Sequence, residues 1–216
     1  NKHNSLNKIP RIIKELKDDK SIAIVSDAGM PGICDPGEEI TKSVKAEGID
    51  VICIPGACAA ITALSSSGLP SSSFVFEGFL PKKKSDREKI LIEISKNKKT
   101  TIIYESPHRL KKTLKELSRF CGGDREIMIA RELTKKFEEH IGKNINDVIS
   151  FFEDKEVIGE ITIVVKGINK KVILFDESDL KKDLKDLVNA GLSLSAASKY
   201  LAKKYGLKKS VIYNLN

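Results

Sequence analysis

A glycine-bearing turn with two carboxylates, residues 26–37, has the residue types in this sequence that best suit ligand binding. It follows the apolar run 22–25, which has no polar alternation and is typical of a strand buried on both faces of a parallel sheet. Loops after such strands form the ligand crevice of open α/β folds. Glycines let the backbone approach a ligand, while Asp27 and Asp35 offer carboxylates to hydroxyl or amino groups. The turn predicts a site for a small polar molecule; the alternative is a structural turn in which Asp35 caps the next helix.

A second turn, residues 54–60, also follows a predicted buried strand and precedes a predicted helix. Small side chains at 57–60 allow close approach of a flat ligand, and the free N–H groups of a helix start can bind it. The alternative is that the small residues serve only to pack the helix closely against the sheet. Neither turn matches the GxGxxG or P-loop patterns, so the sequence does not favour a nicotinamide dinucleotide or ATP.

The first part of the chain alternates helix and strand, which predicts parallel βαβ units. The predicted elements are a sheet-covering helix at 9–19, strand 21–25, helix 36–47, strand 50–54 and helix 58–67. A second α/β set follows: strand 74–80, a capping-box start at 85–88 for a helix to 97, strand 100–104, a helix from Pro107 that Ser106 caps and Gly122 ends, strand 126–130, a helix at 147–153 and strand 160–166. Helices at 179–189, 195–205 and 208–214 predict a small helix-turn-helix-like module.

Composition limits the class of protein. No apolar run approaches the ~20 residues that a membrane span needs, and residues 1–4 do not resemble a signal peptide, so we expect a soluble, cytoplasmic protein. The four cysteines have no CxxC spacing, so we expect reduced thiols and no metal site. The net charge of +8 favours a polyanionic partner, and residues 178–216 carry eight lysines against three aspartates, which is +5 of that charge.

Polar segments also stand at the ends or beginnings of later strands, where loops can converge. Together with the two turns they form an ordered set: His3-Asn4, SDAGMPGICDPG, PGACAAITALSSSGLP, FEGFLP, YESPHR, ARELTK and GEITIVVKG. This ordered set resembles the tetrapyrrole-methylase superfamily and, within it, the branch that methylates small-subunit ribosomal RNA. The resemblance covers about 3–167. The family normally begins with a strand and a loop near Val-Gly-Thr-Pro-Ile-Gly-Asn, and the printed sequence starts after both, so we expect an exposed sheet edge and one cofactor-facing loop fewer.

The resemblance implies an α/β fold of two α/β subdomains, residues 1–70 and 71–167, with a C-terminal helical module at 178–216. It also implies S-adenosylmethionine as methyl donor, 2′-O-methylation of a cytidine in small-subunit (16S) ribosomal RNA, and a homodimer in which the segment 74–80 crosses between lobes or subunits. Carried over residue by residue, the implied cofactor-binding positions are Asp27, Ala28, Gly29, Met30, Ile33, Pro55, Gly56, Cys58, Ala59, Tyr104, Arg131, Leu133, Gly159, Glu160 and Ile161.

A ribose hydroxyl needs a base, or a cation that stabilises the developing alkoxide. The matching loops offer Lys135, Glu105 and Glu132 as catalytic candidates, with activation assigned to Lys135 or Glu105. The expected RNA contacts are His3, Asn4, Arg109, Arg131, Lys199, Lys203, Lys204, Lys208 and Lys209. The alternative for each loop residue is a surface ion pair or a structural cap, and the alternative for the tail lysines is a solvated lysine face. Two other functions stay open: methylation of a tetrapyrrole in cobalamin or sirohaem synthesis, which the lysine-rich tail disfavours, and a non-catalytic RNA-binding protein.

Overall fold

The computed structural model describes residues 7–168 and 177–215, except 206 and 208. Contacts divide the chain into two compact units, residues 1–168 and 169–216. The further boundary expected near residue 70 lies inside the first unit. The predicted RNA contacts at His3, Asn4 and Lys208 lie outside the described residues.

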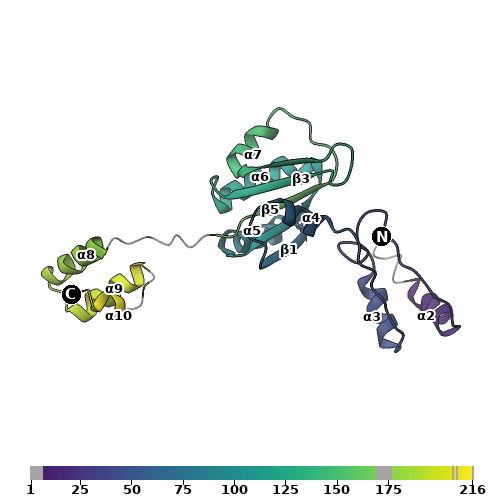
Figure 1. Cartoon of the computed structure of the whole chain (residues 1–216), viewed down its shortest axis with the longest axis horizontal. Helices are drawn as coiled ribbons and strands as arrows, with labels where there is room; N and C mark the ends of the chain where they lie inside the picture. Colours follow the sequence, from purple (N-terminus) through teal and green to yellow (C-terminus); the bar gives the residue numbers. More distant parts are fainter. Residues whose placement is uncertain (1–6, 169–176, 206, 208, 216) are drawn as a thin grey trace. The chain divides into compact units, whose positions relative to one another are not determined.

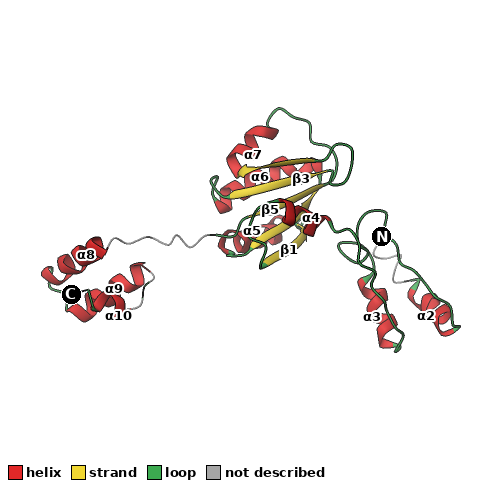
Figure 2. Cartoon of the chain, in the orientation of Figure 1, coloured by secondary structure: helices red, strands yellow, loops and turns green. Residues whose placement is uncertain are grey.

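The described part of the first unit contains one mixed five-stranded sheet (Figures 1 and 2). Its strands are β1 (Phe74–Phe79), β2 (Thr100–Glu105), β3 (Glu126–Arg131), β4 (Glu139–Asn144) and β5 (Ile161–Val165), in the order β1-β2-β5-β3-β4. β1 and β2 are parallel, and every other pairing is antiparallel. The apolar runs predict four of these strands. They do not predict β4, because a mostly polar edge strand lacks the apolar alternation that marks a buried one.

Successive side chains of the strands point to opposite faces of the sheet. On one face, Ile103 and Ile163 join a core cluster with α5 (Lys84–Lys96), α6 (Pro107–Cys121) and α7 (Ile145–Phe152). On the other face, Ile102 and Val164 pack with α4 (Ala59–Ser66) (Figure 1). All four of these side chains are buried, and each stabilises the fold by about 1.5–3 kcal/mol. The sheet is therefore anchored on both faces, which fixes the positions of its edges.

Helix ends follow the sequence signals only in part. The prediction for α6 is confirmed: Ser106 is its N-cap residue, Pro107 its first residue, and Gly122 ends it with φ of +87°. The capping box predicted for α5 is wrong. Because α5 already begins at Lys84, the Ser85 hydroxyl lies inside the first turn, where it hydrogen-bonds to Asp86 instead of capping the helix.

The amino-terminal region differs from the prediction. The helices α2 (Ile9–Lys17) and α3 (Glu38–Ala46) are present, but α2 contacts α3 and buries none of its residues, so the prediction that it covers a sheet is wrong. The strands predicted at 21–25 and 50–54 are also wrong, since neither segment pairs with another described residue and Val25 and Ile52 are more than 80% exposed. An apolar run becomes a strand only where neighbours supply hydrogen bonds and cover both faces.

The second unit is helical. It consists of α8 (Glu177–Asn189), α9 (Leu194–Tyr205) and α10 (Lys209–Tyr213), as the sequence predicts within a few residues. Leu184, Leu201 and Ile212, one from each helix, are buried in its core. The second unit thus has a packed core of its own, which holds the backbones of the three helices in place.

Three further observations concern both units. None of the described helices is long and apolar enough to cross a membrane. Within the described ranges, no cluster of histidine, cysteine or acidic side chains is arranged to hold a metal ion. All four cysteines are free thiols.

Candidate functional site

The strand register brings the predicted site segments to one edge of the sheet. Phe79, at the end of β1, pairs with Tyr104 of β2. Next to it, Glu105 at the end of β2 pairs with Ile161 at the start of β5, and Ile161 also pairs with Arg131 at the end of β3. Segments far apart in the sequence, at 76–81, 104–109, 130–135 and 159–162, thus meet at this edge.

The second turn reaches the same edge through Tyr104. The backbone N–H of Ala60, in the first turn of α4, donates to the Tyr104 hydroxyl at 3.0 Å. Cys58 and Leu133 pack in the same apolar cluster as the Tyr104 ring. Burial raises the pKa of Tyr104 to about 12, so its hydroxyl is neutral near pH 7 and serves as a hydrogen-bonding group.

The first turn lies against both the second turn and β1. Gly29 has φ of +73°, and a Cβ atom there would lie 3.5 Å from the carbonyl oxygen of Ala57. A Cβ atom at Gly78 would lie only 3.0 Å from the Sγ atom of Cys34, so a glycine in β1 makes room for this turn. The first turn therefore lies against β1, next to the end of that strand that carries Phe79.

The two aspartates of the first turn have different surroundings. The Ser26 hydroxyl donates to Asp35 Oδ2 at 2.9 Å, so Asp35 closes the turn on itself. The alternative role of Asp35 as a helix cap is wrong, because α3 has Gly37 as its N-cap residue and no side-chain cap. Asp27 is exposed and makes no hydrogen bond or ion pair with any described residue. Its carboxylate is therefore the one available to a ligand.

Glu132, Lys135 and Glu160 form one polar cluster where β3 ends and β5 begins. Glu132 Oε1 accepts from the Glu160 backbone N–H at 2.8 Å and from Lys135 Nζ at 2.9 Å, while Lys135 also donates to Glu160 Oε2 at 3.1 Å. Glu132 and Thr134 have φ of +52° and +66°, values that non-glycine residues rarely adopt. Such backbone strain is typical of functional sites, where surrounding contacts hold the chain in place.

These contacts decide the charge of the cluster. The hydrogen bonds that Lys135 donates to Glu132 and then to Glu160 raise the pKa of Lys135. The hydrogen bonds that Glu132 accepts from the Glu160 backbone and then from Lys135 lower the pKa of Glu132. Near neutral pH Lys135 is therefore a cation and Glu132 an anion. Lys135 can stabilise developing negative charge, but as a protonated amine it cannot accept a proton.

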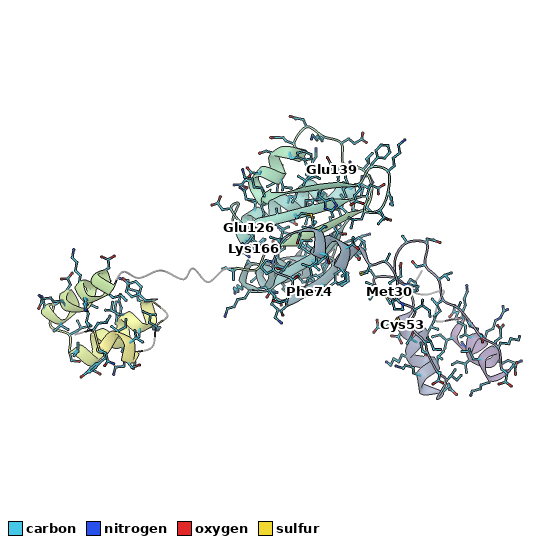
Figure 3. The ribbon with its side chains drawn as sticks, in the orientation of Figure 1. Met30, Cys53, Phe74, Glu126, Glu139 and Lys166 are labelled. Carbon is cyan, nitrogen blue, oxygen red and sulfur yellow. The ribbon has the colours of Figure 1, made fainter. Side chains whose placement is uncertain are left out.

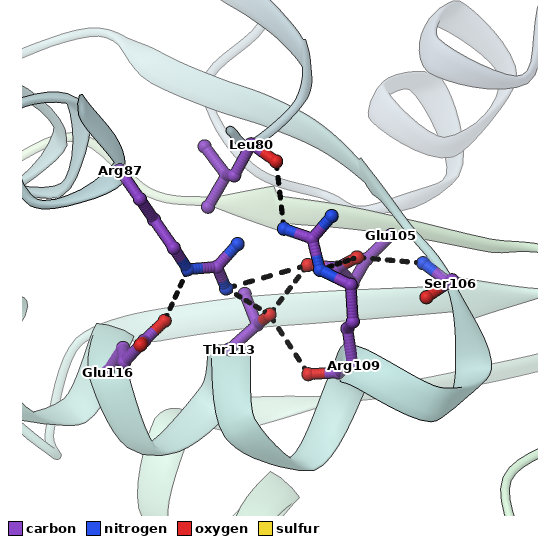
Figure 4. A network of polar contacts seen from close by, with 7 residues as sticks. All are labelled: Leu80, Arg87, Glu105, Ser106, Arg109, Thr113 and Glu116. Carbon is purple, nitrogen blue, oxygen red and sulfur yellow. Dashed lines mark hydrogen bonds and ion pairs between the residues drawn. The ribbon is translucent and has the colours of Figure 1, made fainter. Parts of the chain in front are cut away.

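Glu105 occupies a different environment from that of an activating base. Its side chain is fully buried and accepts hydrogen bonds from the Thr113 hydroxyl at 2.6 Å and the Ser106 backbone N–H at 2.9 Å. Arg87 from α5 and Arg109 from α6 flank it at 3.6 and 3.3 Å, as Figure 4 shows. A base must reach the proton it removes. We therefore assign Glu105 to an interior network that positions the end of β2, in place of the predicted role in hydroxyl activation.

The two arginines expected to hold phosphate are both engaged within the protein. Arg131 pairs with Glu139 of β4 at 3.0 Å (Glu139 is labelled in Figure 3). Arg109 donates to the Leu80 carbonyl at 2.8 Å as well as facing Glu105. Their part in RNA binding stays a prediction.

Sequence reasoning missed the aromatic contacts of this edge. The rings of Phe76 and Phe79 lie edge-on to Tyr104, with centroids 4.9 and 5.7 Å away, and Phe79 is 55% exposed. The aromatic alternation of the segment 74–80 predicts a strand, but nothing in it shows which rings face the site. The strand partner Tyr104 decides that.

In the second unit the predicted RNA-binding lysines fall into two groups. Lys204 pairs with Asp183 at 3.1 Å, and Lys209 donates to the Ser195 hydroxyl at 2.7 Å. Lys199 and Lys203 are exposed and make no hydrogen bond or ion pair with any described residue. Of the predicted RNA-binding lysines that the structure describes in this unit, these two have ammonium groups with no partner among the described residues.

Comparison with known proteins decides the family. Residues 2–148 match the family described as Tetrapyrrole (Corrin/Porphyrin) Methylases. A protein of Synechocystis sp. named ribosomal RNA small subunit methyltransferase I is 39% identical over 215 residues, which are 99% of this chain and 77% of that protein. The chain belongs to the ribosomal RNA small subunit methyltransferase I family. Its resemblance to this family, seen first in the ordered motifs, is thus confirmed.

Solved structures of other methyltransferases are similar in fold to this chain. The methyltransferase CobJ aligns with a TM-score of 0.59 and 18% identity, over 76% of this chain and 71% of that one. A uroporphyrin-III C-methyltransferase of Thermus thermophilus, complexed with S-adenyl homocysteine, aligns with a TM-score of 0.50 and 14% identity, over 74% and 73%. At these identities the likeness shows the tetrapyrrole-methylase fold, which confirms the predicted α/β class.

Proposed function

We propose that this chain is an S-adenosylmethionine-dependent methyltransferase that modifies small-subunit ribosomal RNA at the 2′-hydroxyl of a cytidine. The observation that carries the proposal is the 39% identity, over nearly the whole chain, with a relative named for methylating that RNA. The geometry supports it, because the segments expected to bind the cofactor converge at one edge of the sheet. We place the activity in the cytoplasm, where ribosomal RNA is available to a modifying enzyme.

The residues at this edge fit the cofactor. The exposed Asp27 carboxylate suits the amino or hydroxyl groups of S-adenosylmethionine, and a Cβ atom at Gly56 would meet nothing within 4 Å, which leaves space in front of the backbone there. α4 begins at Ala59, directly after Cys58, and has no side-chain cap, so first-turn N–H groups other than that of Ala60 are left for a ligand. The remaining expected contacts are Ala28, Met30, Ile33, Pro55, Arg131, Leu133 and Ile161. When bound, the cofactor supplies a methyl group on a positively charged sulfur.

The chain's own side chains would position and activate the RNA hydroxyl. Lys135 holds a positive charge where β3 ends, and it would stabilise the negative charge that develops on the attacking oxygen. Glu132 fixes the ammonium of Lys135 through its Oε1 atom, and Glu160 holds it from the other side. Holding nucleophile and methyl donor at near-attack distance supplies much of the rate in such reactions. Lys135 is the group we assign to activation.

RNA is favoured over a tetrapyrrole as substrate. The solved uroporphyrin-III C-methyltransferase shares only the fold, at 14% identity, whereas the ribosomal RNA relative is 39% identical. The second unit also presents exposed lysines without a partner among the described residues, Lys199 and Lys203 among them, which suits a polyanion. A non-catalytic RNA-binding protein would share these lysines but would not need the strained cluster around Glu132.

We also propose a homodimer. β1 is an edge strand of the sheet, and its terminal side chains Phe74 and Phe79 are 38% and 55% exposed. An edge strand with exposed aromatic side chains is a surface that proteins usually cover. Light scattering on the purified chain should give twice the monomer mass; a monomer at all micromolar concentrations would contradict the proposal.

The cofactor site is tested by a matched pair of variants. Gly29 and Gly48 have nearly equal φ values, +73° and +72°, so valine strains the backbone similarly at both, but Gly48 ends α3 and has no other atom within 4 Å. Calorimetry should show that Gly29→Val weakens S-adenosylmethionine binding and that Gly48→Val does not. Equal affinities in two folded variants would remove the first turn from the site. Transfer of label to small-subunit RNA then separates an enzyme from an RNA-binding protein.

A further inference from the structure

The sequence Lys-Tyr occurs twice in α9, and its two copies have different surroundings. The second copy, Lys204-Tyr205, is tied to the module, because Lys204 and the Tyr205 hydroxyl both bind Asp183 of α8. The first copy, Lys199-Tyr200, has no such partner. Tyr200 is 56% exposed and makes no hydrogen bond or ring contact with any described residue. One turn of the same helix therefore presents an aromatic ring to solvent.

Two unpaired cations share this face of the helix. Lys203 lies three residues after Tyr200 and four residues after Lys199, so its side chain is next to both of theirs on the helix surface. Lysines four residues apart repel each other and destabilise a helix. α9 contains no acidic residue that would offset the repulsion. The arrangement is understandable if an anionic partner neutralises both lysines.

The backbone beneath these side chains is held firmly. Ala197, Ser198 and Leu201 on the opposite side of α9 are at most 1% exposed, and Ala197 and Leu201 belong to the apolar core that α9 shares with α8 and α10. The Tyr200 ring is thus carried by an anchored helix, and a flat ligand can bind it without ordering a loop first.

We propose that Lys199, Tyr200 and Lys203 form a binding site for one unpaired nucleotide of RNA. The base stacks on the Tyr200 ring, and the two ammonium groups contact the phosphates that flank it. Every base has a π face, and aromatic side chains on a positively charged surface are the usual platform for single-stranded nucleic acid. Bases inside a duplex are not free to stack on a side chain, so the site distinguishes single-stranded RNA from duplex RNA. This inference rests on the proposed RNA substrate and names the form of RNA that the second unit binds.

The test uses the full chain and a fluorescent single-stranded oligocytidylate, with anisotropy titrations at several salt concentrations. Tyr200→Ala should weaken binding at least about fivefold and leave the salt dependence unchanged, because stacking involves no counterion release. Tyr200→Phe should bind like the parent chain. Replacing Lys199 and Lys203 by glutamine should reduce the log–log salt slope by about 1.4, the value for two phosphates of a single strand.

Tyr213 provides the matched control. It is a 46% exposed tyrosine of the same unit, and the nearest lysine one turn away in α10, Lys209, is bonded to Ser195. Tyr213→Ala should leave affinity unchanged, and Tyr200→Ala should not alter binding of a duplex of the same length. Equal losses from Tyr200→Ala and Tyr213→Ala, or a Tyr200→Ala variant that binds like the parent, would overturn the stacking site. If the parent chain still methylates small-subunit RNA, the proposed function survives that result.

Discussion

Replacing Arg87 by methionine removes the guanidinium that reaches Glu105 from α5. Taking one partner from a buried ion pair costs about 3–5 kcal/mol, because the other charge stays buried. Glu105 keeps its hydrogen bonds from Thr113 at 2.6 Å and from the Ser106 N–H at 2.9 Å, so we expect the lower end of that range. For a folding unit of this size, about 3 kcal/mol lowers the melting temperature by roughly 6–12 °C.

The matched control for Arg87→Met is Lys89→Met on the same helix. The Lys89 side chain is 75% exposed, and its ion pair with Asp86, at 3.6 Å, lies at the surface. Such pairs contribute about 0–1 kcal/mol, so Lys89→Met should melt close to the parent chain. The double variant Arg87→Met, Glu105→Gln should lose less stability than the two single losses added together, because the buried side chain at position 105 is then uncharged and no longer needs the guanidinium of Arg87. If Arg87→Met and the Lys89→Met control have the same melting temperature, Glu105 is not held by this network and its assignment as an interior positioning residue is wrong.

Two further predictions concern the cluster around Glu132. At Gly159, with φ of +90°, a Cβ atom would lie 2.5 Å from the Glu132 side chain, whereas at Gly122, with φ of +87°, it would meet nothing within 4 Å. Gly159→Ala should therefore lower cofactor affinity in calorimetry much more than Gly122→Ala, and equal effects would contradict the contact. Because the pKa of Glu132 is lowered from 4.5 on folding, its contribution to stability is full above that pH and is lost as pH falls through the folded pKa. The melting difference between the parent chain and Glu132→Gln should accordingly shrink from about pH 7 to about pH 3; a constant difference would rule out the ionised pair with Lys135.

Local signals predicted the parts of the fold that local interactions decide. Ser106 stands at the N-cap position of α6 without a side-chain cap, and Pro107 and Gly122 mark the two ends of the helix because the fixed φ of proline and the positive φ of glycine act within one turn. The apolar runs that became β2 and β5 are buried on both faces of the sheet. Each of these elements is specified by residues next to one another in the sequence.

Long-range partners explain what the sequence left undetermined. The polar strand β4 forms because β3 pairs with it along its whole length. The residue pattern of 139–144 does not predict a strand. Segments 21–25 and 50–54 have strong strand character but no neighbour among the described residues. The sequence does not show that Glu105 is buried against Arg87, because Arg87 stands eighteen positions earlier in the chain. Glu105 is therefore predicted as a reactive carboxylate.

The motifs in the sequence predict which loops form the candidate site, but they do not assign the roles of the residues within it. The ordered motifs named the loops that converge at one sheet edge, including Tyr104 and Glu132. The charge state of Lys135 came only from its distances to two carboxylates. The sequence likewise does not distinguish Lys199 and Lys203 from Lys204, whereas in the structure Asp183 pairs with Lys204.

The most direct test of the account follows the methyl group itself. The purified chain is incubated with S-adenosylmethionine labelled in its methyl group, small ribosomal subunits and, in parallel, a uroporphyrinogen. We predict that label enters the RNA and, after alkaline hydrolysis, is recovered in a dinucleotide that resists cleavage, because a 2′-O-methyl group removes the hydroxyl that alkali needs. Lys135→Met should lose this transfer while it still binds the cofactor in calorimetry. Label in the tetrapyrrole, or in RNA fragments that alkali reduces to single nucleotides, would contradict the proposed reaction.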